Sequence, residues 1–139
     1  MPRICIIVPF FENQTAEPAL EITVTESVIQ NLVDDNTLKV TGEDRADAIL
    51  QGQIVEFQNR PFSFDANLNA EEYRIDISVK ATLTNRESGE AIWQNQIFKG
   101  HGTYFLDVSE NEGNTFDEAV DLAIKEITNE ILNKTTQDW

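Results

Sequence analysis

The stretch YRIDISVKATL, residues 73–83, alternates apolar and polar side chains without a break. Successive side chains of a β-strand point to opposite faces, so this pattern predicts a strand with one buried face and one wet face. The face predicted to be buried carries Tyr73, Ile75, Ile77, Val79, Ala81 and Leu83. The face predicted to be wet carries Arg74, Asp76, Ser78, Lys80 and Thr82.

The segments on either side of this strand predict a long antiparallel hairpin. Residues 85–89 have the composition of a turn, and residues 91–104 read as the returning strand. Upstream, residues 48–59 form a further strand, in which Gly52 indicates a bulge or a close backbone approach. Residues 60–71 are predicted to be a loop.

The N-terminal part predicts a strand–helix–strand unit. Residues 3–8 are an apolar run typical of a buried strand, and residues 9–13 follow as a loop. Pro18 opens a predicted helix whose apolar stripe starts at Leu20, and residues 38–40 form a short second strand. If these two strands share one sheet, the crossover between them makes them parallel.

The C-terminal part predicts a second amphipathic helix after a polar, acidic loop at residues 106–114. Thr115 and Glu118 fit a capping box, and apolar residues recur on one face from Phe116 to Ile131, in a helix that runs to about residue 134. We therefore expect an α+β fold, a two-layer sandwich with two helices packed on one face of a mixed sheet. That sheet is expected to have four or five strands, including the long antiparallel hairpin.

The composition is that of a folded protein, and its length of 139 residues fits a single domain over residues 1–139. The chain holds 25 acidic and 10 basic residues, for a net charge of −15. Such a surface repels phosphate backbones, so we expect no nucleic-acid partner. The single cysteine, Cys5, excludes an internal disulfide.

A search for catalytic or metal-binding constellations leaves no candidate. His101, the only histidine, lies between two glycines near the end of the hairpin and reads as an exposed strand residue. The loop that begins at Asp107 has glycine at the seventh position rather than the sixth that a calcium loop requires. Glycine motifs for nucleotides do not occur. We therefore expect a binding protein without enzymatic activity, metal or cofactor.

Several segments, taken in order, match a known pattern. The first is IIVPFFEN at residues 6–13, followed by Thr15 and by EPAL at 17–20. Next come ADAILQG at 46–52, FDAN at 64–67 and EYRI at 72–75. The last are GEAIW at 89–93 and the terminal helix that runs to Trp139. This succession resembles the LptE-like lipopolysaccharide-assembly lipoproteins of Gram-negative bacteria, over nearly the whole chain.

The resemblance implies a non-catalytic subunit of the outer-membrane lipopolysaccharide transport complex. Its partner would be an LptD-like β-barrel, which it plugs while aiding lipopolysaccharide delivery to the cell surface. It would lie at the periplasmic face of the outer membrane, held by a lipid anchor that this chain does not include. The alternative is another periplasmic envelope module, such as a secretion- or Tol-associated lipoprotein domain, because the opening motif recurs in such proteins.

Five residues are candidates for contact with the partner or with lipopolysaccharide: Arg60, Phe62, Phe64, Arg74 and Lys80. The basic residues either balance charge on an acidic sheet or form a small patch for a phosphate group. The two phenylalanines either belong to an interface, where exposed aromatics are common, or tuck under the sheet edge. The net charge of −15 favours a protein partner over a broad surface for anionic lipopolysaccharide.

Overall fold

The computed structural model describes residues 4–35, 38–41, 46–106 and 114–138. Within them the chain forms six strands and two helices. In chain order these are β1 Ile4–Ile7, β2 Glu12–Asn13, α1 Leu20–Asp35, β3 Leu38–Val40, β4 Ala48–Phe64, β5 Ala70–Asn85, β6 Ala91–Phe105 and α2 Phe116–Asp138.

The strands of the described residues form one mixed sheet with the order β3-β1-β4-β5-β6, and β2 pairs with β4 beyond the end of β1. β1 is parallel to both β3 and β4, as the predicted strand–helix–strand unit requires. β4, β5 and β6 form an antiparallel meander of long strands. β2 adds a sixth strand to the predicted four or five.

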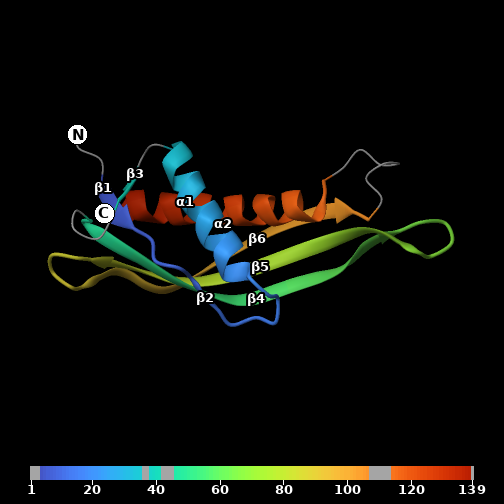
Figure 1. Cartoon of the computed structure of the whole chain (residues 1–139), viewed down its shortest axis with the longest axis horizontal. Coiled ribbons are helices and arrows are strands. Elements are labelled where there is room, and N and C mark those ends of the chain that lie inside the picture. The colour runs from blue at the N-terminus through green and yellow to red at the C-terminus, as the bar shows by residue number, and fades with distance from the viewer. Residues whose placement is uncertain (1–3, 36–37, 42–45, 107–113, 139) are drawn as a thin grey trace.

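Both helices cover the same face of the sheet, so the molecule has two layers (Figure 1). This confirms the predicted α+β sandwich. The opposite side of the meander, called the open face below, carries the polar residues that alternate with the buried ones. No helix in the described part of the chain is both long enough and apolar enough to cross a membrane.

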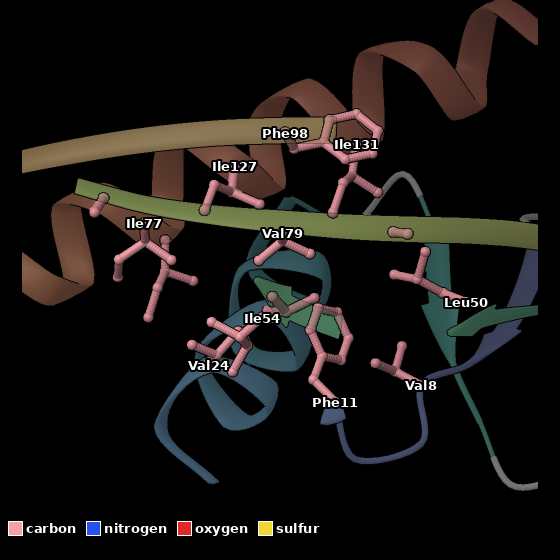
Figure 2. Close-up of a cluster of buried hydrophobic side chains, with 14 of the residues drawn as sticks. Val8, Phe11, Val24, Leu50, Ile54, Ile77, Val79, Phe98, Ile127 and Ile131 are labelled. Carbon is pink, nitrogen blue, oxygen red and sulfur yellow. The ribbon is translucent and has the colours of Figure 1, made fainter. Parts of the chain in front are cut away.

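The core fills the space between the helices and the sheet. Figure 2 shows Val24 of α1 and Ile127 of α2 directed toward Ile77 and Val79 of β5. Five of the six residues predicted to be buried on β5 are at most 1% exposed. The sixth, Tyr73, is half-buried, and its ring stacks on that of Tyr104 with 5.7 Å between centroids.

Two close contacts explain how α2 reaches β6. A Cβ on Gly100 would collide with the carbonyl oxygen of Ala123, and one on Gly102 would collide with that of Ala119. The missing side chains therefore let the helix backbone lie directly on the strand. The N-terminus of α2 has the predicted capping box, since Glu118 N–H donates to Thr115 Oγ1 and Thr115 N–H donates to Glu118 Oε1, both at 3.2 Å.

The predicted loop at residues 60–71 is wrong, because β4 continues to Phe64 and β5 begins at Ala70. β2 pairs with β4 only as far as Ile54, so the end of β4 has β5 as its one paired neighbour among the described strands. Pro61 lacks a backbone N–H, and such an edge position, next to a shift in register, tolerates it. The strand therefore continues through a proline that is typical of a loop when judged from the sequence.

The predicted loop at residues 9–13 is also only partly correct. Glu12–Asn13 is the short strand β2, and Phe11 is a core residue with 2% of its surface exposed. The backbone N–H of Phe11 donates to the buried Thr25 Oγ1 of α1 at 2.9 Å. Its ring occupies the place where a Cβ on Gly52 would lie, which identifies the close approach that this glycine indicated.

Candidate functional site

The open face brings two of the predicted contact residues together. Arg60 of β4 and Arg74 of β5 are opposite each other in the strand register. Both donate to Asp76, with 3.2 Å from Arg60 Nη2 to Asp76 Oδ2 and 3.1 Å from Arg74 Nε to Asp76 Oδ1. One carboxylate thus faces two guanidinium groups, and this Arg60–Asp76–Arg74 cluster keeps a formal charge of +1. Its exposed donors suit a single phosphate or carboxylate group.

Lys80 does not belong to that cluster. It lies six positions along β5 from Arg74, which is about 20 Å for a strand that rises about 3.3 Å per residue. Lys80 is instead the centre of a row that crosses four strands on the open face, in the register Glu12–Gln53–Lys80–Ile97. Its ammonium group makes neither an ion pair nor a hydrogen bond with the described residues. The predicted basic patch is therefore divided into two separate places.

Phe62 and Phe64 lie at the tip of the β4–β5 hairpin, which projects beyond the helices in Figure 1. Their exposed fractions are 53% and 55%, so neither tucks under the sheet edge. Leu68, in the turn between the two strands, is 83% exposed. Three large apolar side chains therefore project at one end of the molecule, and we call them the apolar tip.

The turn that carries the apolar tip is well ordered by its own hydrogen bonds. Asp65 Oδ1 accepts from the backbone N–H groups of Asn67 and Asn69 at 2.8 and 3.0 Å. Leu68 has a φ of 64°, a conformation that is uncommon for residues with a side chain. The backbone N–H of Leu68 donates to the carbonyl oxygen of Asp65 at 3.0 Å, so the turn, rather than core packing, holds this exposed leucine.

Charge divides between the two layers. The helices α1 and α2 hold ten acidic and two basic residues. The long strands β4, β5 and β6 hold four of each. The negative charge of the protein is therefore concentrated away from the meander, whose open face is polar but close to neutral. This distribution could not be read from the total charge alone.

The described residues show no arrangement typical of a catalytic centre. His101 Nδ1 lies 3.2 Å from Glu126 Oε1, and both side chains are about half exposed. The same carboxylate accepts the backbone N–H of His101 at 3.1 Å, so Glu126 caps the outer edge of β6. Across the described part of the chain no three His, Cys, Asp or Glu residues gather to hold a metal ion. The calcium-like loop at residues 107–113 lies outside the described residues.

Two features at or beside the open face are not predicted by the sequence. One is the exposed Phe10, because nothing in the pair Phe10-Phe11 shows which ring is buried. The other is the group of amide side chains around Lys80, which lie on β4 and β6 and meet only through the strand register. The repeated glutamines at Gln51 and Gln53, and the run from Gln94 to Gln96, were the available signal.

A family model described as lipopolysaccharide-assembly, LptE, matches residues 6–135 of the chain. The match spans every helix and strand except the ends of β1 and α2. Among curated proteins, none matches the chain significantly.

Solved structures of low sequence identity share the fold. The hypothetical protein CT253 from Chlamydia trachomatis has 13% identity, with 96% of each chain covered and a TM-score of 0.69. The PelC dodecamer protein from Paraburkholderia phytofirmans has 14% identity, 90% and 86% coverage and a TM-score of 0.59. A minor lipoprotein from Acinetobacter baumannii has 14% identity, 98% and 96% coverage and a TM-score of 0.56.

Proposed function

We propose that this chain, which belongs to the LptE lipopolysaccharide-assembly family, is a non-catalytic subunit that binds an LptD-like outer-membrane β-barrel. In that complex it would plug the barrel and aid the delivery of lipopolysaccharide to the cell surface. The family match over residues 6–135 carries the proposal. The native protein would be anchored by lipid at the periplasmic face of the outer membrane.

The surface of the meander supports a barrel as the partner. The interior of an outer-membrane barrel is polar, so a plug gains most from a polar surface without a large excess of one charge. The open face has this character, whereas the helix layer is strongly acidic. The apolar tip supplies the kind of exposed aromatic side chain that anchors protein interfaces.

Co-purification from envelope extracts tests the barrel partnership. The full-length lipidated protein should recover a large outer-membrane barrel, and the double variant Phe62→Ala, Phe64→Ala should recover much less of it. The matched control is Val33→Ala with Leu122→Ala, which removes exposed apolar side chains from the two helices. Failure of the wild-type protein to recover any barrel would reject the partnership and favour the alternative of another envelope binding module.

The Arg60–Asp76–Arg74 cluster supports a finer part of the proposal, direct contact with one phosphate group of lipopolysaccharide. Bidentate guanidinium groups match phosphate geometry, and Asp76 holds the two side chains side by side. Lipopolysaccharide binding should fall in the variants Arg60→Glu and Arg74→Glu. Lys125→Glu, a charge reversal on the exposed side of α2, is the control. If both arginine variants bind lipopolysaccharide as the wild type does, the proposed phosphate contact is rejected. The proposed partnership with a barrel would still stand.

A further inference from the structure

The open face is hollowed around Lys80. The hollow has a volume of about 470 Å³. Its floor is formed by alternating residues of two central strands, Gln51 and Gln53 of β4 with Thr82 and Lys80 of β5, which pair in register. Its rims come from distant parts of the sequence. One is the segment around β2, with Pro9, Phe10 and Glu12, and the other is the start of β6, with Gln94 and Asn95.

The lining of the hollow is rich in groups that both donate and accept hydrogen bonds. Four of the residues that line it carry an amide side chain, and Thr82 adds a hydroxyl. An amide offers two donors and one carbonyl acceptor, and a hydroxyl offers one of each kind. Such a surface matches a ligand that is itself dense in hydroxyl groups. An apolar ligand would leave these groups unpaired, at a cost for each of them.

A backbone distortion fixes the rim on β6. Asn95 has a φ of 52°, and the register of β6 against β5 shifts between the pairs Ala81–Gln96 and Leu83–Trp93. The backbone N–H of Asn95 donates to Thr82 Oγ1 at 3.0 Å, so a residue of the floor holds the distorted segment. Asparagine tolerates this left-handed conformation, and such irregularities in a strand re-aim side chains and are over-represented next to functional sites.

Phe10 and Lys80 add two further elements of recognition. Phe10 is 69% exposed on the rim, although its neighbour Phe11 is in the core. An exposed aromatic ring beside hydrogen-bonding groups offers a flat apolar surface on which the C–H face of a sugar ring can pack. Lys80 is partly buried in the floor, and its ammonium group has no acidic partner among the described residues. A carboxylate or phosphate group on the ligand would pair with it.

We infer that this hollow binds a saccharide that carries one acidic group. The amides and Thr82 hydrogen-bond its hydroxyls, Phe10 packs against a ring, and Lys80 pairs with the acid. A single acidic group fits better than several, because the protein carries a net charge of −15 and Glu12 stands on the rim. This site goes beyond the proposed barrel partnership, and its test does not depend on that partnership.

Titration of the ¹⁵N-labelled chain, followed by nuclear magnetic resonance, tests the inference. The acidic probes are sialyllactose, with one carboxylate, and trehalose 6-phosphate, with one phosphate. Lactose and trehalose are their neutral counterparts, and inorganic phosphate is the anion without a sugar. At millimolar concentrations at least one acidic sugar should shift the side-chain amide resonances of Gln51, Gln53, Gln94 and Asn95. Its neutral counterpart should bind about tenfold more weakly, and phosphate alone should leave these resonances in place.

Two variants assign the binding to the hollow. Lys80→Gln should reduce the affinity for the acidic sugar to the affinity for its neutral counterpart. Phe10→Ala should weaken the binding of both sugars. Lys125→Gln on α2 is the control and should change the affinity for neither sugar. Both residues of the hollow are outside the core, so the amide spectrum of each variant should stay that of the folded protein. The inference is overturned if neither acidic sugar shifts these resonances, if phosphate alone shifts them equally, or if both variants bind as the wild type does.

Discussion

The two faces of the meander are built from the same three strands, yet they serve different purposes. The face under the helices is filled by apolar side chains, and Gly100 and Gly102 let α2 lie directly on it. The open face carries paired charges, amides and hydroxyls, and no described element covers it. The packing that stabilises the fold therefore lies on the face under the helices, and the open face remains accessible to a partner or ligand.

Adjacent residues show the same division at the smallest scale. Phe10 and Phe11 have the same side chain, but one is exposed and the other is in the core. His101 lies between Gly100 and Gly102 but reaches Glu126 at the outer edge of β6, with half of its side chain exposed, while the glycines lie directly against the backbone of α2. Substitutions at neighbouring positions should therefore change the free energy of unfolding by very different amounts. Comparing such pairs tests whether stability comes from the packed side of the sheet.

The largest effect is expected at Phe11. Phe11→Ala should lower the free energy of unfolding by about 3–5 kcal/mol, because it empties a core site beside Gly52. Phe10→Ala should change it by less than about 0.5 kcal/mol, as for exposed residues in general. Urea denaturation of both variants measures the difference. Similar losses at the two positions would break the proposed division between the faces.

A smaller loss is expected where α2 meets β6. Gly100→Ala places a methyl group against the backbone of Ala123, and overpacking of this kind costs about 1–3 kcal/mol or somewhat more. His101→Ala removes only a half-exposed pair with Glu126 and should cost less than about 1 kcal/mol. Thermal and urea unfolding of the two variants compare them. A greater loss for His101→Ala would show that the edge contact, rather than the close approach, holds the helix.

The capping box gives the next effect in size. Thr115→Ala removes the hydroxyl that accepts the N–H of Glu118, and loss of such a cap costs about 1 kcal/mol. Thr23→Ala, on the exposed side of α1, should change the free energy of unfolding by less than about 0.5 kcal/mol. Chemical denaturation of the two variants measures this difference in the free energy of unfolding. Equal stability of the Thr115 variant and the wild type would show that the cap contributes nothing to the helix layer.

The smallest effect is expected on the open face. Asp76→Asn leaves Arg60 directly opposite Arg74 without their shared carboxylate, and like charges in this position cost about 0.2–1 kcal/mol. Added salt should reduce the loss, because it screens repulsion between exposed charges. Glu130→Gln, on the exposed side of α2, should not share this salt dependence. The urea midpoint of each variant, measured at low and high sodium chloride concentration, distinguishes the two. If salt does not reduce the stability lost in Asp76→Asn, repulsion between Arg60 and Arg74 is not its cause.

Much of the fold could be predicted because its signals are local. The alternation along residues 73–83 assigns each of these side chains of β5 to a face, and the apolar stripes predict both helices. The capping box of Thr115 and Glu118 marks the start of α2 in the sequence, and the structure contains its two hydrogen bonds. The prediction failed at the end of β4, where Pro61 signals a loop in a sequence but is acceptable at a sheet edge. Whether a strand is central or at an edge depends on its neighbours in space.

The candidate site shows the same limit more strongly. The sequence by itself determined the alternation of β5, the helix faces, the acidity and the family resemblance, because these depend on residue type and spacing along the chain. Only the tertiary structure decided that Arg60 meets Arg74 at Asp76, and that Lys80 lies apart from them among amides. It also decided which of the two adjacent phenylalanines enters the core. The physical reason is register: strand pairing brings together residues that are far apart in the chain, and no local pattern specifies those partners.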